Sequence, residues 1–449
     1  MCGIFGVSAP RMSSVLEDLY LGLYALQHRG QESAGIAWLD GKGNLELQKG
    51  MGLVHACLNQ EELAKERTKC AIGHVRYSTA GESNIINAQP LHATYSKGQI
   101  AVAHNGNITN ARALKRDLES RGAIFQSTTD TEVILHLMAH EQSLSPIDAL
   151  VKSLSKLRGA FSIIAIIEGR LVAARDPWGF RPLVIGKRDD VYYVASESCA
   201  LDIVNADFVR DVAPGEIVII EEGKLESLNM PVKAERHFRC SFEYVYLARP
   251  DSVIDDKSVY DVRFKLGQRL ACTCPCSEGE LVLGMPDSGT IGALGYASKS
   301  KLPFEMAVVK NRYVGRTFIQ PTQRVRSLGV QIKLNPIKGL IKGKSIVVVD
   351  DSIVRGTTSK MAVKFLRDAG AMRVHLRIAS PPVKFPCLYG IDTPTSSDLA
   401  AAKMDVEALR DYVGADSLCF LDVSDLVCSV GLPEEELCTA CFSGLYLKE

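Results

Sequence analysis

The sequence predicts a protein of two domains that combine helices with sheets, and the second domain is of the α/β class with a parallel sheet. Its 449 residues are enough for about two to three domains with sizeable cores. A polar, proline-containing stretch at 229–238 separates two halves, so we place the domains at 2–232 and 233–449. The stretch 345–378 has the pattern strand, loop, helix, strand, from which parallel sheets are built.

The composition excludes several classes of partner. Lys plus Arg and Asp plus Glu both total 52, so no net charge attracts nucleic acid or an anionic membrane. No apolar run approaches the length of a membrane span, and no basic region followed by an apolar core opens the chain. We therefore expect a cytoplasmic protein in a reducing compartment, where 13 cysteines do not form a disulfide framework.

The first three residues, Met1, Cys2 and Gly3, suggest a nucleophile. A small second residue permits removal of the initiator Met, which would leave a thiol and a free α-amino group on one cysteine. An α-amino group titrates near ~8 and can activate the thiol without a histidine. The alternative from these residues alone is a small buried cysteine at the start of a strand.

A helix should follow, with Ser14 and Glu17 as a capping box. After it, polar groups repeatedly come directly after short apolar segments, which is the layout of site loops carried on a rigid sheet. Four segments have this character: 27–31, 73–79, 103–107 and 127–132.

Together with Cys2, these four segments resemble the glutaminase domain of the N-terminal nucleophile amidotransferases. The resemblance covers about the first half of the chain and implies an α+β sandwich of the αββα type. It also implies roles for individual residues: Cys2 as nucleophile, Arg76 for the glutamine α-carboxylate, Asp130 for its α-ammonium group, and Asn105 with Gly106 as the oxyanion hole. Their chemistry agrees, because a guanidinium holds a carboxylate bidentately, and an amide with a backbone N–H can stabilise an oxyanion.

In the second half, a β-branched run at 346–349 reads as a strand buried on both faces, with Asp350 and Asp351 at its carboxyl end. Gly356, Thr357 and Thr358 then precede a helix. Ligands bind at this edge of such units, where backbone N–H groups and a helix dipole can hold a phosphate. Adjacent aspartates can hold sugar hydroxyls or hydrated Mg²⁺. On this stretch alone, acids that merely cap a helix are the alternative.

The stretch resembles the phosphoribosylpyrophosphate signature of type I phosphoribosyltransferases. With a strand at 281–284, its turn at 285–289 and a cation-rich segment at 310–321, the order of motifs resembles the glutamine phosphoribosylpyrophosphate amidotransferases over nearly the whole chain. The resemblance implies that the segment 312–326 is a lid. It places Gly356, Thr357 and Thr358 at the 5-phosphate, and Mg²⁺ at Ser288, Asp350 and Asp351.

The same resemblance implies a reaction. Glutamine is hydrolysed at Cys2, and the ammonia reaches phosphoribosylpyrophosphate to give 5-phosphoribosylamine, glutamate and pyrophosphate, the first committed step of de novo purine synthesis. It further implies feedback inhibition by purine nucleotides and a homo-oligomer, either a dimer or a tetramer.

Cys438 and Cys441 have a spacing that lets two thiolates bind one metal, and spacing alone allows a Cys₄ zinc site equally well. Resemblance to the iron-sulfur subgroup of the family implies a [4Fe–4S] cluster on Cys240, Cys387, Cys438 and Cys441. Members with a cluster commonly begin with a propeptide, whereas only Met1 precedes Cys2 here. The cysteines at 272, 274 and 276 could form a second metal site, but we expect inert or surface thiols.

Two other interpretations remain to be weighed. Amidotransferases of other substrates share the first half but lack the signature from Asp350 to Thr358. A non-enzymatic regulator that binds phosphoribosylpyrophosphate would not need an intact set of glutaminase loops, and a glutaminase assay separates it from the enzyme.

Overall fold

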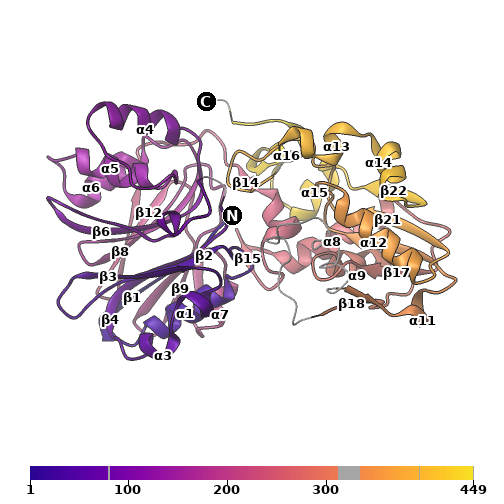
Figure 1. Cartoon of the computed structure of the whole chain (residues 1–449), viewed down its shortest axis with the longest axis horizontal. Helices are drawn as coiled ribbons and strands as arrows, with labels where there is room; N and C mark the ends of the chain where they lie inside the picture. Colours follow the sequence, from indigo (N-terminus) through magenta and orange to yellow (C-terminus); the bar gives the residue numbers. More distant parts are fainter. Residues whose placement is uncertain (79–80, 312–333, 394, 448–449) are drawn as a thin grey trace.

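The computed structural model describes residues 1–78, 81–311, 334–393 and 395–447. Figure 1 shows two bodies arranged along the long axis of the molecule, the first built mainly from the indigo to magenta part of the chain and the second from its rose to yellow part. The N-terminus lies at the junction between them. Within the described residues, no helix has both the length and the apolar character needed to cross a membrane.

The first domain contains two stacked antiparallel sheets with helices on both outer faces, so the predicted αββα sandwich is confirmed. The seven-stranded sheet has the order β11-β9-β10-β1-β4-β2-β3, and the six-stranded sheet has the order β13-β12-β8-β7-β6-β5. The strands are β1 (Gly3–Ser13), β2 (Ser33–Leu39), β3 (Leu45–Met51), β4 (Thr68–Arg76), β5 (Leu91–Tyr95), β6 (Gly98–Ile108), β7 (Gly159–Ile167), β8 (Arg170–Arg175), β9 (Val184–Arg188), β10 (Val191–Ala195), β11 (Asp207–Asp211), β12 (Glu216–Glu221) and β13 (Lys224–Asn229).

Helices cover the two outer faces of this sandwich. Those beside the first sheet are α1 (Leu16–Ala25), α2 (Val54–Cys57), α3 (Gln60–Leu63) and α7 (Cys199–Asp202), and those beside the second are α4 (Ala111–Ser120), α5 (Glu132–His140) and α6 (Pro146–Leu154). Side chains of β1 alternate: Ile4 packs between the sheets, whereas Phe5 and Val7 pack in the layer of α1.

Helix α1 begins without the predicted capping box. Its N-cap residue is Val15, and no side chain caps the helix. Ser14 lies one position too early for its hydroxyl to serve as the cap. The helix is instead held by tertiary packing: a Cβ atom on Gly22 would lie 2.6 Å from the Phe5 ring. Close packing on the sheet therefore replaces local capping.

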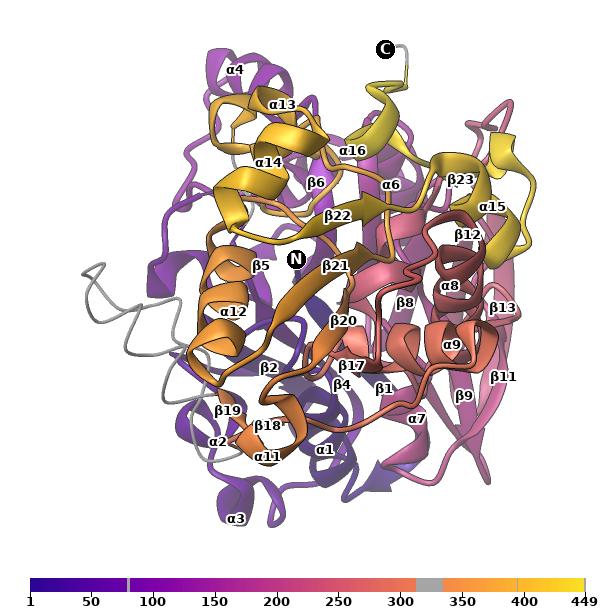
Figure 2. The same ribbon diagram turned by 90° about the vertical axis from the view of Figure 1, so that its right-hand side faces the viewer.

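The second domain is built on a parallel sheet of order β17-β20-β21-β22. Figure 2 shows α8 and α9 on one face of this sheet and α12 with α14 on the other. Strand β20 is buried on both faces as predicted, because Val347 and Val349 pack in the layer of α8 and α9, while Ile346 and Val348 pack in the layer of α12. The parallel α/β domain is confirmed.

The described elements of the second half are, in chain order, β14 (Arg239–Cys240), η2 (Glu243–Leu247), β15 (Val253–Ile254), β16 (Lys257–Ser258), α8 (Val259–Thr273), β17 (Leu281–Gly284), α9 (Gly289–Ser300), β18 (Val308–Lys310), β19 (Leu334–Pro336), α11 (Lys338–Ile341), β20 (Ser345–Asp350), α12 (Thr357–Asp368), β21 (Arg373–Ile378), η4 (Ser396–Asp398), α13 (Ala400–Lys403), α14 (Val406–Val413), β22 (Ser417–Phe420), α15 (Val423–Val430), η5 (Glu434–Glu436), β23 (Leu437–Cys438) and α16 (Ala440–Ser443). Strand β23 returns to the domain junction and pairs in parallel with β14.

One disulfide corrects the expectation for the cysteines that follow α8. Cys274 is bonded to Cys419 on β22 across a sequence separation of 145 residues. The prediction of inert or surface thiols was therefore wrong for Cys274, while Cys272 is an exposed free thiol and Cys276 a half-buried one. The spacing of the three neighbouring cysteines could not reveal this disulfide, because Cys419 is distant from Cys274 in the sequence.

The domain junction contains a buried ionic cluster of Arg29, Arg181, Glu197 and Glu243, which we call the junction cluster. Arg29 donates to Glu243 at 2.8 Å and is also paired with Glu197, and Arg181 donates to Glu243 at 3.0 Å. All four side chains are at most 2% exposed. Burial alone would raise the pKa of Glu243, but Arg29 and Arg181 bring it below its usual value. The charges are therefore compensated within the junction.

We expect Glu243→Gln to destabilise the protein, because it leaves two guanidinium groups buried with one fewer charge partner. Breaking a buried ion pair from one side costs about 3–5 kcal/mol, so the midpoint of thermal unfolding should fall markedly. Asp117→Asn is the control, since Asp117 forms an exposed pair with Arg121 and such pairs contribute about 1 kcal/mol or less. Equal unfolding midpoints for the two variants would contradict a stabilising role for the junction cluster.

Candidate functional site

Cys2 lies at the entry to β1 with three groups around it. Its backbone N–H donates to Asn105 Oδ1 at 3.2 Å, its thiol donates to the Tyr77 carbonyl at 3.6 Å, and its carbonyl accepts from Arg29 Nε at 2.9 Å. Met1 is still attached, so a peptide nitrogen stands where the α-amino group of an N-terminal cysteine would be. Burial lowers the pKa of the Met1 amine to about 5. The structure therefore brings the predicted nucleophile and Asn105 into direct contact.

The two polar atoms of the Asn105 side chain have different surroundings. Its Oδ1 atom accepts from Cys2, while its buried Nδ2 group has no hydrogen-bond partner among the described residues. A buried donor left unpaired costs free energy, and native proteins keep few of them outside functional sites. A developing oxyanion beside the Cys2 sulfur would supply the missing acceptor.

Gly106, the second residue of the predicted oxyanion hole, occupies a position that excludes side chains. Its φ is +154°, and a Cβ atom there would lie 2.1 Å from the Ala160 carbonyl oxygen on β7. The residue is paired with Phe161 in the β6–β7 ladder. Asn105 and Gly106 therefore lie at the end of a rigid strand rather than in a loose loop.

Arg76, at the end of β4, is 2% exposed and forms an ion pair with Glu32. It also donates to the Glu82 carbonyl at 3.2 Å. Glu32 in turn accepts from the Ser78 N–H at 2.9 Å, so this carboxylate holds both the guanidinium and the following loop. The sequence reasoning missed Glu32, although it directly follows the polar segment 27–31.

Asp130 lies beside β6, where its Oδ2 accepts from the Ile108 N–H at 2.8 Å. His104 Nδ1 is 3.9 Å from the same carboxylate. Burial lowers the pKa of His104, so at neutral pH the ring carries no charge that would pair with Asp130. The carboxylate thus has no fixed cationic partner from this histidine.

In the second domain, Asp350 and Asp351 lie at the carboxyl end of β20 as predicted. Ser288 lies in the connection between the neighbouring strand β17 and helix α9, directly before α9. Burial raises the pKa of Asp350 well above its usual value, and the neighbouring Asp351 raises it further. Burial also raises the pKa of Asp351, against a stabilising hydrogen bond from Ser288. The carboxylates of the half-buried Asp350 and the buried Asp351, with the Ser288 hydroxyl, form an oxygen donor set that fits a hard divalent cation.

Gly356 begins the turn into α12 with a φ of +74°, and Thr357 and Thr358 form the first turn of this 12-residue helix. Its N-terminal N–H groups and dipole lie at the same sheet edge as Asp350. The predicted lid at 312–326 lies outside the described residues. Just before it, Lys310 forms an ion pair with Asp287.

The four cysteines predicted to bind a cluster converge from distant parts of the chain. Cys240 and Cys438 are in register in the β14–β23 pair, and Cys441 follows in α16. Burial raises the pKa of Cys441 well above its usual value, and the charges of Cys438, Cys240 and Cys387 raise it further. They are not in ligating geometry, since within the described ranges no three or more His, Cys, Asp or Glu side chains are arranged to hold a metal ion.

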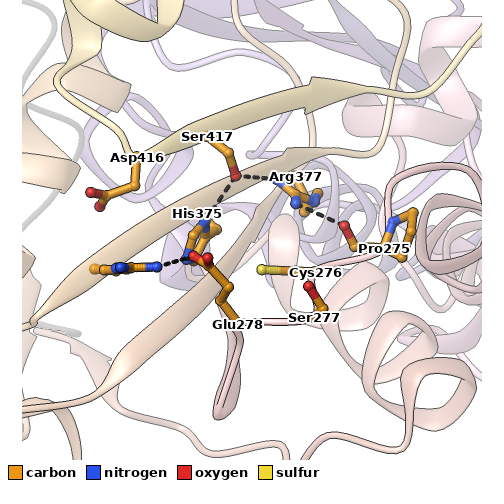
Figure 3. Close-up of a pocket in the computed structure, with 9 residues that line it drawn as sticks. Pro275, Cys276, Ser277, Glu278, His375, Arg377, Asp416 and Ser417 are labelled. Carbon is orange, nitrogen blue, oxygen red and sulfur yellow. Dashed lines mark hydrogen bonds and ion pairs between the residues drawn. The ribbon is translucent and has the colours of Figure 1, made fainter.

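A pocket of about 420 Å³ that the sequence did not indicate lies at the opposite, amino edge of the parallel sheet (Figure 3). Its polar groups bind one another: Arg373 pairs with Glu278, and Arg377 donates to the Cys274 carbonyl at 2.8 Å. His375 contacts the hydroxyls of Ser345 and Ser417 at 3.1 and 2.9 Å. Because these groups satisfy each other, we assign this pocket no part in the reaction.

Comparison with known proteins agrees with both halves. The Glutamine amidotransferase domain family matches residues 74–202. The amidophosphoribosyltransferase of Bacillus subtilis is 45% identical over 457 residues, covering 100% of this chain and 94% of its own. The amidophosphoribosyltransferase of Mycobacterium tuberculosis is 46% identical, and the match covers 99% of this chain and 86% of that protein. The chloroplastic amidophosphoribosyltransferase 1 of Arabidopsis thaliana is 45% identical, and the match covers 99% of this chain and 78% of that protein.

A solved structure extends this likeness to three dimensions. The glutamine phosphoribosylpyrophosphate amidotransferase of B. subtilis, complexed with ADP and GMP, superimposes with a TM-score of 0.92 at 45% identity. The superposition covers 100% of this chain and 98% of that one. Identity of this extent over both domains, with the same fold, shows that the chain belongs to the amidophosphoribosyltransferase family, whose members are glutamine amidotransferases and pentosyltransferases.

Proposed function

We propose that the two groups of residues described above are two active sites that divide the reaction of the family between them. At the first, glutamine is hydrolysed through a thioester on Cys2, and at the second the released ammonia displaces pyrophosphate from C1 of phosphoribosylpyrophosphate. The observation that carries the first assignment is the Asn105 side chain, which contacts the backbone nitrogen of Cys2 and keeps a buried, unpaired donor beside it.

Before the first turnover, hydrolysis of the Met1–Cys2 peptide bond releases Met1 and frees the α-amino group of Cys2. This amine takes the thiol proton, and the thiolate attacks the carboxamide carbon of glutamine. Asn105 Nδ2 and the Gly106 N–H stabilise the oxyanion. The amine then returns the proton to the leaving ammonia, and water hydrolyses the thioester to release glutamate. Asn105 Oδ1 keeps the amine oriented throughout, because it already accepts from this nitrogen.

Glutamine is held by its amino-acid end. Its α-carboxylate binds the Arg76 guanidinium, which also pairs with Glu32. Its α-ammonium group pairs with Asp130. The uncharged His104 next to Asp130 supports this role, since an imidazolium there would repel an ammonium group. Asn87 links the two segments, because it donates to the Glu82 carbonyl that Arg76 also contacts and to Thr128 Oγ1 two residues before Asp130.

At the second site, Ser288, Asp350 and Asp351 would hold Mg²⁺. When bound, Mg²⁺ would neutralise charge on the departing pyrophosphate. Gly356, Thr357 and Thr358 bind the 5-phosphate through backbone N–H groups and hydroxyls at the start of α12. The raised pKa values of Asp350 and Asp351 support a cation here, because burial disfavours both charged forms and Asp351 further disfavours ionisation of Asp350, which a bound cation would offset.

We further propose that Cys240, Cys387, Cys438 and Cys441 hold one [4Fe–4S] cluster with a structural role. Three buried thiols and one half-buried thiol in one region outside the two reaction sites support this assignment, which requires them to move into ligating geometry when the metal binds. The cluster would join the domain junction, the segment after β21 and the C-terminal segment, and metal binding to the native state adds to folding stability.

The family membership also supports regulation and assembly. A related enzyme of B. subtilis was crystallised with ADP and GMP, and we propose that purine nucleotides likewise inhibit this chain. We further propose that it acts in the cytoplasm as a homo-oligomer, a dimer or a tetramer.

Cys2→Ala should abolish synthesis of phosphoribosylamine from glutamine and leave synthesis from added ammonia largely intact, because the thiol serves only the first half-reaction. Both rates are measured as pyrophosphate release. Cys272→Ala, which removes an exposed free thiol, should change neither rate. A folded Cys2→Ala enzyme that loses ammonia-dependent synthesis as well would argue against two separate sites.

Asp350→Asn and Asp351→Asn should each suppress synthesis from glutamine and from ammonia alike. Losing a carboxylate of the cation site should cost about 2–4 kcal/mol of transition-state stabilisation by analogy with other charge-stabilising groups. Asp368→Asn at the exposed end of α12 is the control, since its carboxylate only pairs with Lys364 on the surface. Wild-type kinetics in both site variants would rule out their assigned role.

Anaerobically purified protein should be brown and contain about four irons per chain. Serine at Cys240, Cys387, Cys438 or Cys441 should remove the colour and increase protease sensitivity, whereas Cys428→Ser, at an exposed free thiol, should not. Iron and zinc are measured by elemental analysis. Stoichiometric zinc, or full iron content in a Cys438→Ser Cys441→Ser variant, would overturn the cluster assignment.

A further inference from the structure

A turn of the second domain, residues 387–390, lies directly against the strand of the first domain that carries the proposed oxyanion hole. Asn107 Nδ2 on β6 donates to the Leu388 carbonyl at 2.8 Å, across 281 residues of sequence. Gly390 contacts Gly106 so closely that a Cβ atom on Gly390 would lie 2.7 Å from the Gly106 carbonyl carbon and 3.0 Å from its Cα. The two domains therefore meet backbone to backbone at Gly106.

The turn is held rigidly on its other side. Arg181 donates to the Tyr389 carbonyl through Nη2 at 2.6 Å and Nε at 3.1 Å, and its guanidinium is anchored by Glu243 of the junction cluster. The Tyr389 ring stacks on Phe180 with centroids 4.2 Å apart, and its hydroxyl accepts from the Leu447 N–H at 2.8 Å. The buried Gly390 backbone thus has a fixed position relative to β6.

Gly106 depends on such neighbours because it has no side chain of its own to restrict its backbone. On one side it faces the Ala160 carbonyl of β7, and on the other it faces Gly390. Gly390 itself has a φ of +100°, which side-chain-bearing residues rarely adopt. Contact between two glycines allows the second domain to approach Gly106 more closely than any other residue pair would.

We propose that Gly390 is a positioning residue for glutamine hydrolysis: it holds the Gly106 backbone in the orientation in which its N–H points to the oxyanion. This inference rests on the proposed function of Cys2, Asn105 and Gly106. A shift of the Gly106 Cα and carbonyl by a few tenths of an ångström rotates the preceding peptide, which carries the donor. The chemistry of the first site is in this way set by a residue of the second domain.

The test is Gly390→Ala. The added methyl group displaces the Gly106 backbone, so kcat for glutamine hydrolysis should fall about tenfold or more. The KM for glutamine should stay within about twofold, because Arg76 and Asp130 bind the substrate from other segments. Ammonia-dependent synthesis should stay at the wild-type rate.

Alkylation of Cys2 by iodoacetamide separates a misplaced oxyanion hole from a damaged nucleophile. Displacement of iodide at a saturated carbon forms no tetrahedral oxyanion, so its rate reports the thiolate alone. The alkylation rate of Gly390→Ala should equal that of the wild type while its glutaminase kcat is reduced. Parallel losses of alkylation and hydrolysis would overturn the proposal, because they would mean that the nucleophile itself is affected.

Gly431→Ala is the matched control for backbone strain. Gly431 also has a positive φ, +71°, but no atom lies within 4 Å of a Cβ atom placed there. It should leave the kinetics of glutamine hydrolysis unchanged. A second variant, Asn107→Ala, removes the hydrogen bond to the Leu388 carbonyl without adding bulk and should lower kcat by about threefold or more with KM unchanged.

The outcomes are distinct. If the wild-type protein has no glutaminase activity, the proposed function itself fails. If the wild type is active, an unchanged kcat in Gly390→Ala, a rise in KM alone, or an equal loss of ammonia-dependent synthesis overturns the positioning role. Should Gly390→Ala not fold, Asn107→Ala decides: a wild-type kcat in that variant overturns the proposal.

Discussion

The buried carboxylate of Glu243 is the constraint on which the rest of the structure depends. It lies in the second domain and binds two arginines of the first, Arg29 and Arg181. Charges removed from water are tolerated only when each has a well-placed partner, so this carboxylate fixes how the domains meet. Arg29 also donates to the Cys2 carbonyl, and Arg181 donates to the Tyr389 carbonyl, so Glu243 restrains both the proposed nucleophile and the 387–390 turn.

This arrangement explains why the functional groups of the first domain lie at its edge and not at its centre. The entry to β1 and the end of β6 reach the junction, where segments of the second domain contact them. Cys240 and Cys387 lie close to the same junction, since the Cys240 N–H donates to the Phe180 carbonyl at 3.2 Å and the Cys387 sulfur accepts from the Tyr389 N–H at 3.3 Å. A metal centre at the four cysteines would therefore stabilise the surface that supports the proposed glutaminase site.

Both proposed sites contain groups that the protein alone leaves unsatisfied. In the first, Asn105 Nδ2 is buried without a partner among the described residues. In the second, burial disfavours the charged form of Asp350 and of Asp351, and the neighbouring Asp351 disfavours ionisation of Asp350 further. Keeping these groups in place lowers the free energy of unfolding, and a bound ligand with complementary charge or hydrogen-bonding groups would offset this cost. Polar groups that lower the stability of the free protein are typical of binding sites.

The sequence by itself determined the division into two halves, the buried central strand β20 and the Asp350–Asp351 pair at its carboxyl end, because apolar periodicity and turn residues are local signals. It placed Asn105 in a site loop, whereas the structure has it near the end of strand β6. Only the tertiary structure decided which distant groups meet: Glu243 with Arg29 across 214 residues, Cys274 with Cys419 across 145, and Asn107 with Leu388 across 281. The helix α1 shows the same division, since packing on the sheet sets its start and not the predicted cap. A local pattern specifies which face of an element is buried, but the partner on that face is chosen by the packing of the whole chain.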